Sequence, residues 1–445
     1  MHSSGTLSSY VPNVRTDVST LRKPLHGLQI AESCQSRLLH DTSGSGEKTV
    51  ILVWKVVKIK SAVVGFRVPA TQTLLNMTQR DNVTRNCFSL RGFRWKQTSE
   101  AELAEVDSKI LSSMPCVSEK KMVQISNDQH LWSTVSNPKG QGTPLLMVHG
   151  MGGGVGLWSM NLDALSENRP VYAFDLLGFG RSSRPRFSTD PVEAENMFVN
   201  SIEAYREKMG LDKVILLGHS LGGYLCCSYT IRYPQHVKHL ILADPWGMTE
   251  RPNSDAVRNY SISARIFFRI LSPFNPMATI RGVGPWGPSL VRKYRPGLAQ
   301  IFSTKWGDDT LLHQYVYHCN AQTPSGEAGF KHLSWNLGWA LRPMISRIHQ
   351  ISKEIPITFI YGSRSWMDRK TAWDIKNIRH GCYVDVQVLR GAGHHVYAER
   401  HDLFNLLVKS IASSVDKGEL PTFDTKLLQI IRDFPSDADQ PDDQY

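Results

Sequence analysis

The segment GHSLG at residues 218–222 places a serine between two glycines, with the G-x-S-x-G spacing typical of a nucleophilic serine. The apolar run KVILL precedes it and the amphipathic run LGGYLCCSYTIRY follows, which predicts a strand, a sharp turn and a helix. Side chains at 218 and 222 would collide in such a turn, and Ser220 would project its hydroxyl beyond the strand. A glycine-rich helix start with a serine cap would give the same letters, so the flanking elements carry the prediction.

A nucleophilic serine also needs donors for the negative charge that develops on the carbonyl oxygen of its substrate. The segment HGMGGG, residues 149–154, follows the apolar run PLLMV, and its glycines would let the backbone curl beneath a substrate. We expect the backbone N–H groups of Leu221 and Met151 to form this oxyanion hole, with Gly152 as the alternative second donor. The segment fits a phosphate-binding loop less well, because no glycine spacing of that kind leads into a helix.

The acid and the histidine that activate such a serine are expected after it, on loops that follow late strands. The segment GSRSWMD at 362–368 follows the run IPITFIY, and RGAGHH at 390–395 follows the run YVDVQVL. We expect Asp368 to hold the imidazole of His394. His394 would then deprotonate Ser220 and later protonate the leaving group.

Spacing leaves an alternative open for each of these two residues. His395 lies next to His394 and is the alternative base. Asp244 directly follows the run VKHLILA, so a neighbouring strand could also supply the acid. Asp368 also fits an N-cap of the helix expected after it.

Short apolar and β-branched runs alternate with amphipathic segments from about residue 120 onward. The runs predict buried strands at residues 144–148, 170–174, 213–217, 237–243, 355–361 and 383–389. The amphipathic segments predict helices at residues 193–209, 221–233 and 400–415. This alternation predicts an α/β domain with a mostly parallel, doubly wound sheet.

The alternation stops for about a hundred residues, which predicts an inserted helical cap. We therefore divide the chain into a basic, low-complexity N-terminal region at 1–105, a first core segment at 106–247, the cap at 248–351, a second core segment at 352–418 and an acidic C-terminal tail at 419–445. We expect the N-terminal region to be largely disordered or peripheral and the tail to be solvated.

The N-terminal hundred residues contain 14 Lys or Arg against 6 Asp or Glu, which accounts for most of the net charge of +11. Their most apolar stretch, Thr49 to Phe66, has Lys55, Lys58 and Lys60 at its middle, which argues against a membrane-spanning helix. No basic start and cleavage site of a secretory signal is present. No nucleic-acid recognition motif accompanies the charge, so no nucleic-acid partner is expected.

The cap has a basic segment of its own. Residues 251–300 contain eight Lys or Arg and one acid, and Arg258, Arg265 and Arg269 lie opposite isoleucines at helical spacing. A basic amphipathic helix beside an acyl-transfer site predicts binding of an anionic headgroup or a lipid surface. A solvated helix face would explain any single arginine as well.

Seven cysteines lie scattered along the chain with no C-x-x-C pair. Their odd number and irregular spacing argue against a disulfide scaffold or a zinc site. Reduced thiols fit an intracellular compartment. We expect neither a metal nor a cofactor.

Three long strings resemble one known family, the α/β-hydrolase domain-containing proteins 4 and 5. They are RPVYAFDLLGFGRSSRPRF at 169–187, YHCNAQTPSGE at 317–327 and GAGHHVYAE at 391–399, and the similarity extends over about residues 108 to 416. The resemblance implies the α/β-hydrolase fold and a cytoplasmic protein that associates peripherally with lipid droplets or membranes. It leaves a mitochondrial association open.

Two positions refine what this resemblance implies. The coactivator branch of the family resembles this chain but has asparagine where Ser220 stands, which groups this chain with the catalytic branch. The family's H-x-x-x-x-D acyltransferase signature, aligned on His394, meets Glu399 instead of aspartate. We expect Glu399 to lie in the first turn of the last helix and to interact with the helix dipole.

These observations predict a serine-dependent lipid acyl hydrolase or acyltransferase acting on phospholipids or lysophospholipids. By resemblance, its reactions include deacylation of N-acyl phosphatidylethanolamine or lysophospholipids and acyl transfer to lysophosphatidic acid. The alternative is a non-catalytic coactivator of a triglyceride lipase at lipid droplets. The expected partners are the lipid substrate, a membrane or droplet surface, and a triglyceride lipase or droplet-coat protein.

Overall fold

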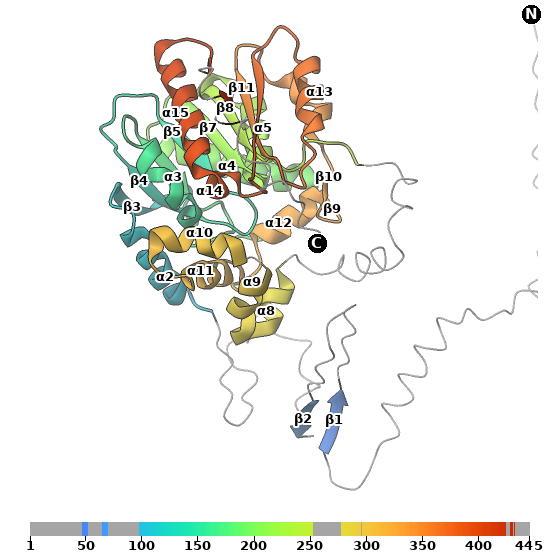
Figure 1. The fold of residues 1–445 in the computed structure, drawn as a ribbon. Helices are drawn as coiled ribbons and strands as arrows, with labels where there is room; N and C mark the ends of the chain where they lie inside the picture. Colours follow the sequence, from blue (N-terminus) through green and yellow to red (C-terminus); the bar gives the residue numbers. More distant parts are fainter. Residues whose placement is uncertain are drawn as a thin grey trace, which may run out of the picture. The chain divides into compact units, whose positions relative to one another are not determined.

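The apolar runs predicted as strands form the strands from β12 to β6 of an eight-stranded sheet with the order β12-β11-β8-β7-β5-β6-β4-β3 (Figure 1). The strands are β3 (Val117–Gln124), β4 (His130–Ser136), β5 (Leu145–Val148), β6 (Val171–Phe174), β7 (Val214–His219), β8 (Val237–Ala243), β11 (Ile357–Gly362) and β12 (Val384–Leu389). The six strands from β12 to β6 are parallel, whereas β3 and β4 pair antiparallel at one edge. The predicted α/β fold with a mostly parallel sheet is confirmed.

The computed structural model describes residues 47–51, 65–69, 98–251, 277–294, 296–423, 428–429 and 431. Strands β1 (Glu47–Ile51) and β2 (Gly65–Pro69) pair antiparallel and belong to a unit separate from the rest of the chain. Lys55, Lys58 and Lys60 lie outside the described residues, and so do Arg258, Arg265 and Arg269 of the cap.

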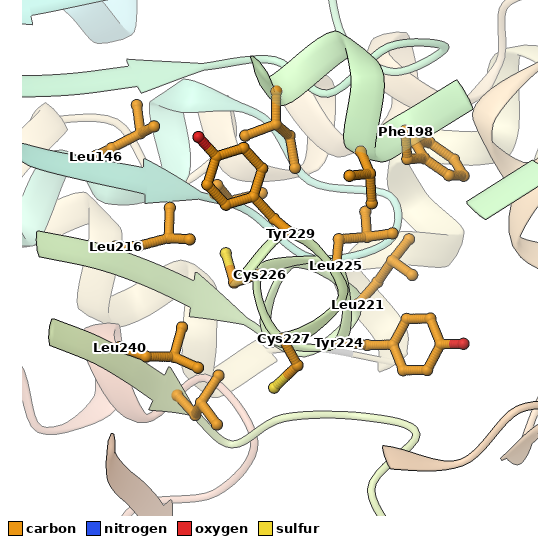
Figure 2. Packing of buried hydrophobic residues seen from close by; sticks show 14 of the residues in the cluster. Leu146, Phe198, Leu216, Leu221, Tyr224, Leu225, Cys226, Cys227, Tyr229 and Leu240 are labelled. Carbon is orange, nitrogen blue, oxygen red and sulfur yellow. The ribbon is translucent and has the colours of Figure 1, made fainter. Parts of the chain in front are cut away.

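Alternate residues of the central strands enter two apolar layers, one on each face of the sheet. Leu146, Leu216 and Leu240 point toward α5 on one face (Figure 2). Their neighbours along the strands, such as Met147 and Leu217, belong to the layer on the other face. Burial on both faces explains why these strands are continuous apolar runs in the sequence.

Helices cover both faces of this sheet. The first layer contains residues of α4 (Pro191–Lys208), α5 (Leu221–Arg232) and α13 (Lys370–Ile378). The second contains residues of α2 (Glu100–Ser112), α3 (Ser159–Leu165), α14 (Val396–Glu399) and α15 (His401–Lys417). Helix α2 begins before residue 106, so the described fold includes the last residues of the region predicted as peripheral.

In its described residues, the segment between β8 and β11 is mostly helical, as the lack of strand pattern predicted, and it also contains a short hairpin that was not predicted. Its elements are α8 (Ala278–Val283), α9 (Gly287–Tyr294), α10 (Pro296–Trp306), α11 (Leu311–Asn320), α12 (Gly326–Leu333), β9 (Ser334–Trp335) and β10 (Trp339–Ala340). Short 3-10 helices lie at Val155–Trp158, Pro234–His236, Gly284–Trp286, Met344–Ser346 and Ile348–Gln350. Helices α10 and α11 contribute to the second apolar layer, so this segment packs on the core.

The start of the predicted tail departs from expectation. Ile431 is 3% exposed and belongs to the second apolar layer, whereas the sequence predicted a solvated tail throughout 419–445. Among the helices that the structure describes, none has both the length and the apolar character needed to cross a membrane.

Candidate active site

Ser220 sits in the sharp turn between β7 and α5, as the G-x-S-x-G spacing predicted. Its backbone angles are φ 53° and ψ −119°, a region that residues with a Cβ rarely enter. A Cβ on Gly218 would lie 2.5 Å from the carbonyl oxygen of Gly222, and one on Gly222 would clash with the carbonyl oxygen of Val148. Glycine is therefore required on both sides of the serine.

His394 lies between β12 and α14 with its imidazole directed at this serine. Its Nε2 atom is 3.1 Å from Ser220 Oγ, and its Nδ1 atom is 2.6 Å from Asp244 Oδ2. Because a carboxylate only accepts, Nδ1 donates to Asp244 and leaves Nε2 to accept the serine proton. His395, the alternative base, instead pairs through Nδ1 with the hydroxyl of Tyr397 at 3.2 Å.

The acid that contacts His394 is Asp244, so the prediction of Asp368 for this position is wrong. Asp368 accepts hydrogen bonds from the backbone N–H of Lys370 at 3.0 Å and from the hydroxyl of Thr371 at 2.9 Å. These bonds lie at the start of α13, where Arg369 is the N-cap, so Asp368 sits one residue before the cap position considered for it. Asp244 follows β8, the strand between β7 and β11, and its φ of 46° bends the chain at the strand end.

Asp244 is fully buried, and its other contacts hold it in place. Ser365 donates its hydroxyl to Oδ2, and the backbone N–H of Gly362 donates to Oδ1 at 3.4 Å. Burial raises the pKa of Asp244 to about 7, while the Ser365 hydrogen bond acts in the opposite direction. The ionised form therefore depends on these donors.

His219 is a positioning residue that the sequence analysis did not single out. Its Nε2 donates to the backbone oxygen of His394 at 3.0 Å and so fixes the loop that contains the base. Complete burial lowers the pKa of His219 to about 3, so this imidazole stays neutral. Its position inside the G-x-S-x-G segment was visible in the sequence, but its contact across the site was not.

The predicted oxyanion donors lie beside the serine. Leu221 is the first residue of α5, so its N–H has no acceptor within the helix, and Met151 and Gly152 line the same cavity as Ser220. Buried His149 braces the loop, since its Nδ1 donates to Gly150 O at 2.7 Å and its Nε2 accepts from Leu176 N at 2.9 Å. Both nitrogens thus have partners in a neutral imidazole.

Glu399 contacts the histidine loop and does not occupy the first turn of the last helix, which corrects the expectation for this residue. Its carboxylate accepts from the backbone N–H of Gly393 at 2.7 Å and of His395 at 3.2 Å. These two residues flank His394. Glu399 is the last residue of the short helix α14, and its two hydrogen bonds hold the backbone on both sides of His394.

A cavity of about 370 Å³ opens at Ser220 and His394. Apart from the serine, the histidines and the glycine loop, its walls are mostly apolar side chains from the core and from the inserted segment: Met151, Leu157, Trp246, Met277, Leu298, Leu312, Val316, Phe330, Leu337 and Trp366. Trp366 is 64% exposed and lies 5.3 Å from His394 between ring centroids, which places it at the rim.

No three His, Cys, Asp or Glu side chains gather as a metal-ligand group in the part of the chain that the structure describes. The arginines predicted to bind a headgroup lie outside the described residues, so that assignment stays a prediction.

The fold and this site define an α/β hydrolase, and a family model described as alpha/beta hydrolase fold matches residues 143–269. Carboxylesterase CesB from Bacillus subtilis shares the fold with a TM-score of 0.50 at 18% identity, covering 70% of this chain and 97% of that one. A bacterial membrane phospholipase A shares it with a TM-score of 0.50 at 19% identity, covering 71% and 91%. These identities support the fold alone.

Two relatives identify the family within this class. The 1-acylglycerol-3-phosphate O-acyltransferase ABHD5 of Sus scrofa is 49% identical over 321 residues, which covers 72% of this chain and 92% of that protein. The (lyso)-N-acylphosphatidylethanolamine lipase of Homo sapiens is also 49% identical over 321 residues and covers 72% and 94%. The chain belongs to the α/β-hydrolase domain-containing protein 4/5 family, as its three long strings predicted.

Proposed function

We propose that this chain is a serine-dependent lipid acyl hydrolase and acyltransferase that acts on phospholipids or lysophospholipids. The observation that carries the proposal is the hydrogen-bonded chain from Ser220 through His394 to Asp244, which meets an apolar cavity at its serine end. An apolar cavity of this kind suits an acyl chain, and the serine lies where the carbonyl of that chain would be held. The acyltransferase and lipase names of the two relatives support the same class of substrate.

The first half of the reaction forms an acyl-serine. His394 Nε2 takes the proton of Ser220 Oγ as the oxygen attacks the carbonyl carbon, and the N–H groups of Leu221 and Met151 stabilise the resulting oxyanion. When this intermediate collapses, the bond to the leaving oxygen or nitrogen breaks and His394 returns the proton to it. Asp244 orients the imidazole and stabilises its charged form throughout.

The second half determines whether the outcome is hydrolysis or transfer. Water or a lipid hydroxyl gives its proton to His394 Nε2 and attacks the acyl carbon, and Ser220 regains its proton as it leaves. The apolar cavity walls exclude part of the water and favour a bound acceptor over bulk solvent. One set of residues can therefore deacylate N-acyl phosphatidylethanolamine or a lysophospholipid and acylate lysophosphatidic acid.

We further propose that the protein works peripherally at lipid droplets or membranes, where substrates of this class reside. The exposed indole of Trp366 at the cavity rim suits such a surface. Coactivation of a triglyceride lipase is the alternative function. The hydrogen bonds from Ser220 to His394 and from His394 to Asp244 favour an enzyme. A coactivator has no need of a serine linked through a histidine to a buried carboxylate.

The test is release of fatty acid from lysophosphatidylethanolamine by the purified full chain. Ser220→Ala should reduce kcat by about 10⁴ to 10⁶ with unchanged circular dichroism, because one hydroxyl is removed without altering the packing. Ser346→Ala, which removes an exposed hydroxyl from a 3-10 helix, should retain full turnover. Full turnover by Ser220→Ala would overturn the proposed function.

A further inference from the structure

Asn320 is a buried amide at the end of α11 that lines the same cavity as Ser220, and it is 5% exposed. Its Nδ2 atom donates to the backbone oxygen of Gly152 at 2.8 Å and to that of Val316 at 2.8 Å. The first of these bonds ties the insertion to the oxyanion loop.

These two bonds fix which way the amide faces. Both N–H groups of Nδ2 are directed at carbonyl oxygens, and a flipped amide would place Oδ1 against the same two acceptors. Nδ2 therefore faces Gly152 and Val316, and Oδ1 faces away from both carbonyls. The main-chain oxygen of Asn320 is engaged separately by Arg281 at 3.1 Å.

Asn320 Oδ1 lies at the cavity wall, beside Gly152 and Met277. Gly152 has φ of 72° and lines the cavity, and a Cβ built on it would lie 3.2 Å from Asn320 Oδ1. The methyl group of Met277 lies 2.9 Å from the same Cβ position, so the oxygen borders the cavity between Gly152 and Met277, one residue from Met151, the predicted oxyanion donor. No donor in the described part of the chain hydrogen-bonds to Oδ1, and the oxygen keeps contact with solvent.

The other polar side chains of this wall are satisfied within the protein. The indole N–H of Trp246 donates to the backbone oxygens of Leu337 and Gly338 at 3.2 and 3.1 Å. The hydroxyl of Tyr397 pairs with His395. When a lipid chain displaces water from the cavity, Asn320 Oδ1 loses its donor unless the lipid brings one, and an unpaired buried acceptor is costly.

We propose that Asn320 Oδ1 accepts a hydrogen bond from an O–H or N–H group next to the scissile carbonyl of the substrate. The residue would select acyl lipids that bring such a donor, either the free glycerol hydroxyl of a lysophospholipid or the N–H of an N-acyl amide. This inference rests on the proposed function and specifies the substrate of the same site. A site built to pair a substrate donor discriminates strongly against the analogue that lacks it.

A purely structural role of Asn320 in holding Gly152 predicts a different result. Loss of that bond would disturb the oxyanion loop and reduce the turnover of every substrate by the same factor. Loss of the Oδ1 acceptor would act only on substrates with the donor. The ratio of two rates on matched substrates therefore separates the two roles.

The experiment compares kcat/KM on two pairs of lipids, using the full chain. The first pair is a 1-acyl lysophosphatidylethanolamine and its 2-deoxy analogue; the second is an N-acyl ethanolamine lipid and its N-methyl analogue. In the wild type, removal of the donor should lower kcat/KM about 10- to 100-fold in one pair. In Asn320→Ala this ratio should fall to between about 0.5 and 2, whereas Gln314→Ala, which removes an amide of α11 that bonds to the hydroxyl of Thr310, should keep the wild-type ratio.

Binding of the same lipids to Ser220→Ala and to Ser220→Ala/Asn320→Ala covers the case in which Asn320→Ala is inactive. The ratio of Kd values within a pair should then depend on Asn320 in the same way. A wild-type ratio near one in both pairs, or a ratio that survives Asn320→Ala, would overturn the inference. Turnover of none of the four lipids would overturn the proposed function instead, and the binding ratios would still decide the role of Asn320.

Discussion

Ser220 adopts a backbone conformation that costs a residue with a Cβ roughly 1 to 3 kcal/mol, and its neighbours hold it there. Its N–H donates to Ala243 O at 3.1 Å, and its carbonyl oxygen accepts from Tyr224 N at 3.2 Å and Trp246 N at 3.1 Å. These bonds tie the turn to the end of β8. The same strand end presents Asp244, so serine and acid are positioned by one set of contacts.

Asparagine substitutions at the two aspartates decide which carboxylate is the acid. Asp244→Asn should lower kcat by about 10⁴, because the amide cannot stabilise the imidazolium of His394. Asp368→Asn is the matched control and should stay within about twofold of the wild type, since its carboxylate bonds only at the start of α13. The measurement compares kcat of the two variants with that of the wild type on one lysophospholipid. A large loss in Asp368→Asn with little loss in Asp244→Asn would restore Asp368 as the acid.

Ser365 gives the site a testable pH dependence. Its hydroxyl hydrogen-bonds the ionised form of Asp244 and opposes the burial that raises the pKa of this acid to about 7. Without that bond the pKa rises further, so a higher pH is needed to ionise the Asp244–His394 pair. Ser365→Ala should therefore move the acid limb of the kcat/KM profile to higher pH, measured between pH 5 and pH 9.

The control for this shift is Ser363→Ala in the same loop, whose hydroxyl accepts from Gly391 N at 3.0 Å and does not contact Asp244. Its acid limb should coincide with that of the wild type. An unmoved limb in Ser365→Ala, or one displaced to lower pH, would contradict the assigned contact.

The sequence predicted the contact between Ser220 and His394 but not the carboxylate that bonds to His394, for a physical reason. Strands β8 and β11 are neighbours, so acids after either strand reach the same edge of the sheet. The conformation of Asp244, with φ of 46°, decides between them, and that conformation depends on contacts from distant segments. Asn320 was likewise visible inside the string YHCNAQTPSGE, but its contact with Gly152 arises only when the insertion packs on the core.

At the level of elements, α14 and the loop before it act as one unit that holds the base. Glu399 ends this helix and accepts the N–H groups on both sides of His394, while Arg364 lies 4.0 Å from the same carboxylate. Such a contact orients the imidazole for any acyl acceptor. The geometry therefore gives the H-x-x-x-x-D-like spacing a positioning role.

Glu399→Gln should slow hydrolysis and acyl transfer by the same modest factor, about tenfold, because glutamine keeps one acceptor and loses the other. His394→Ala should abolish both reactions. The measurement follows fatty-acid release and acylation of lysophosphatidic acid in parallel with one acyl donor. Loss of transfer with hydrolysis retained in Glu399→Gln would reinstate a separate acyltransferase motif.

The central strands were predictable because burial on both faces makes them continuous apolar runs. Strands β3 and β4 were not predicted, since the middle of β3 is the polar run Ser118 to Lys121 and β4 includes Ser133, Thr134 and Ser136. Their antiparallel pairing and the packing of α2 depend on tertiary contacts. The local sequence pattern predicts neither this pairing nor this packing.

At the level of the whole molecule, positive charge gathers outside the α/β core, in the first hundred residues and in residues 251–300. Such charge is worth about 1 kcal/mol per residue near an anionic lipid surface, and salt screens it beyond about 8 Å. An electrostatic attraction of this kind would hold the protein at a phospholipid surface, where the cavity can bind its substrate.

Charge reversal of Arg258, Arg265 and Arg269 to glutamate should reduce flotation of the protein with anionic phospholipid vesicles. Binding of the wild type should also weaken as the salt concentration rises.

The control reverses an equal charge at three exposed lysines of the core, Lys139, Lys208 and Lys417, and should float nearly as the wild type does. Flotation that is unchanged in the arginine variant, or equally reduced in both variants, would refute a specific role for that segment.

An activated Ser220 should react covalently with a fluorophosphonate probe. The full chain is incubated with the probe and the modified peptide is located by mass spectrometry. We predict one adduct on Ser220, lost in Ser220→Ala and strongly slowed in Asp244→Asn, because the probe reacts only with a hydroxyl that a neighbouring base activates. A folded wild-type chain without an adduct, or an adduct that persists in Ser220→Ala, would contradict it.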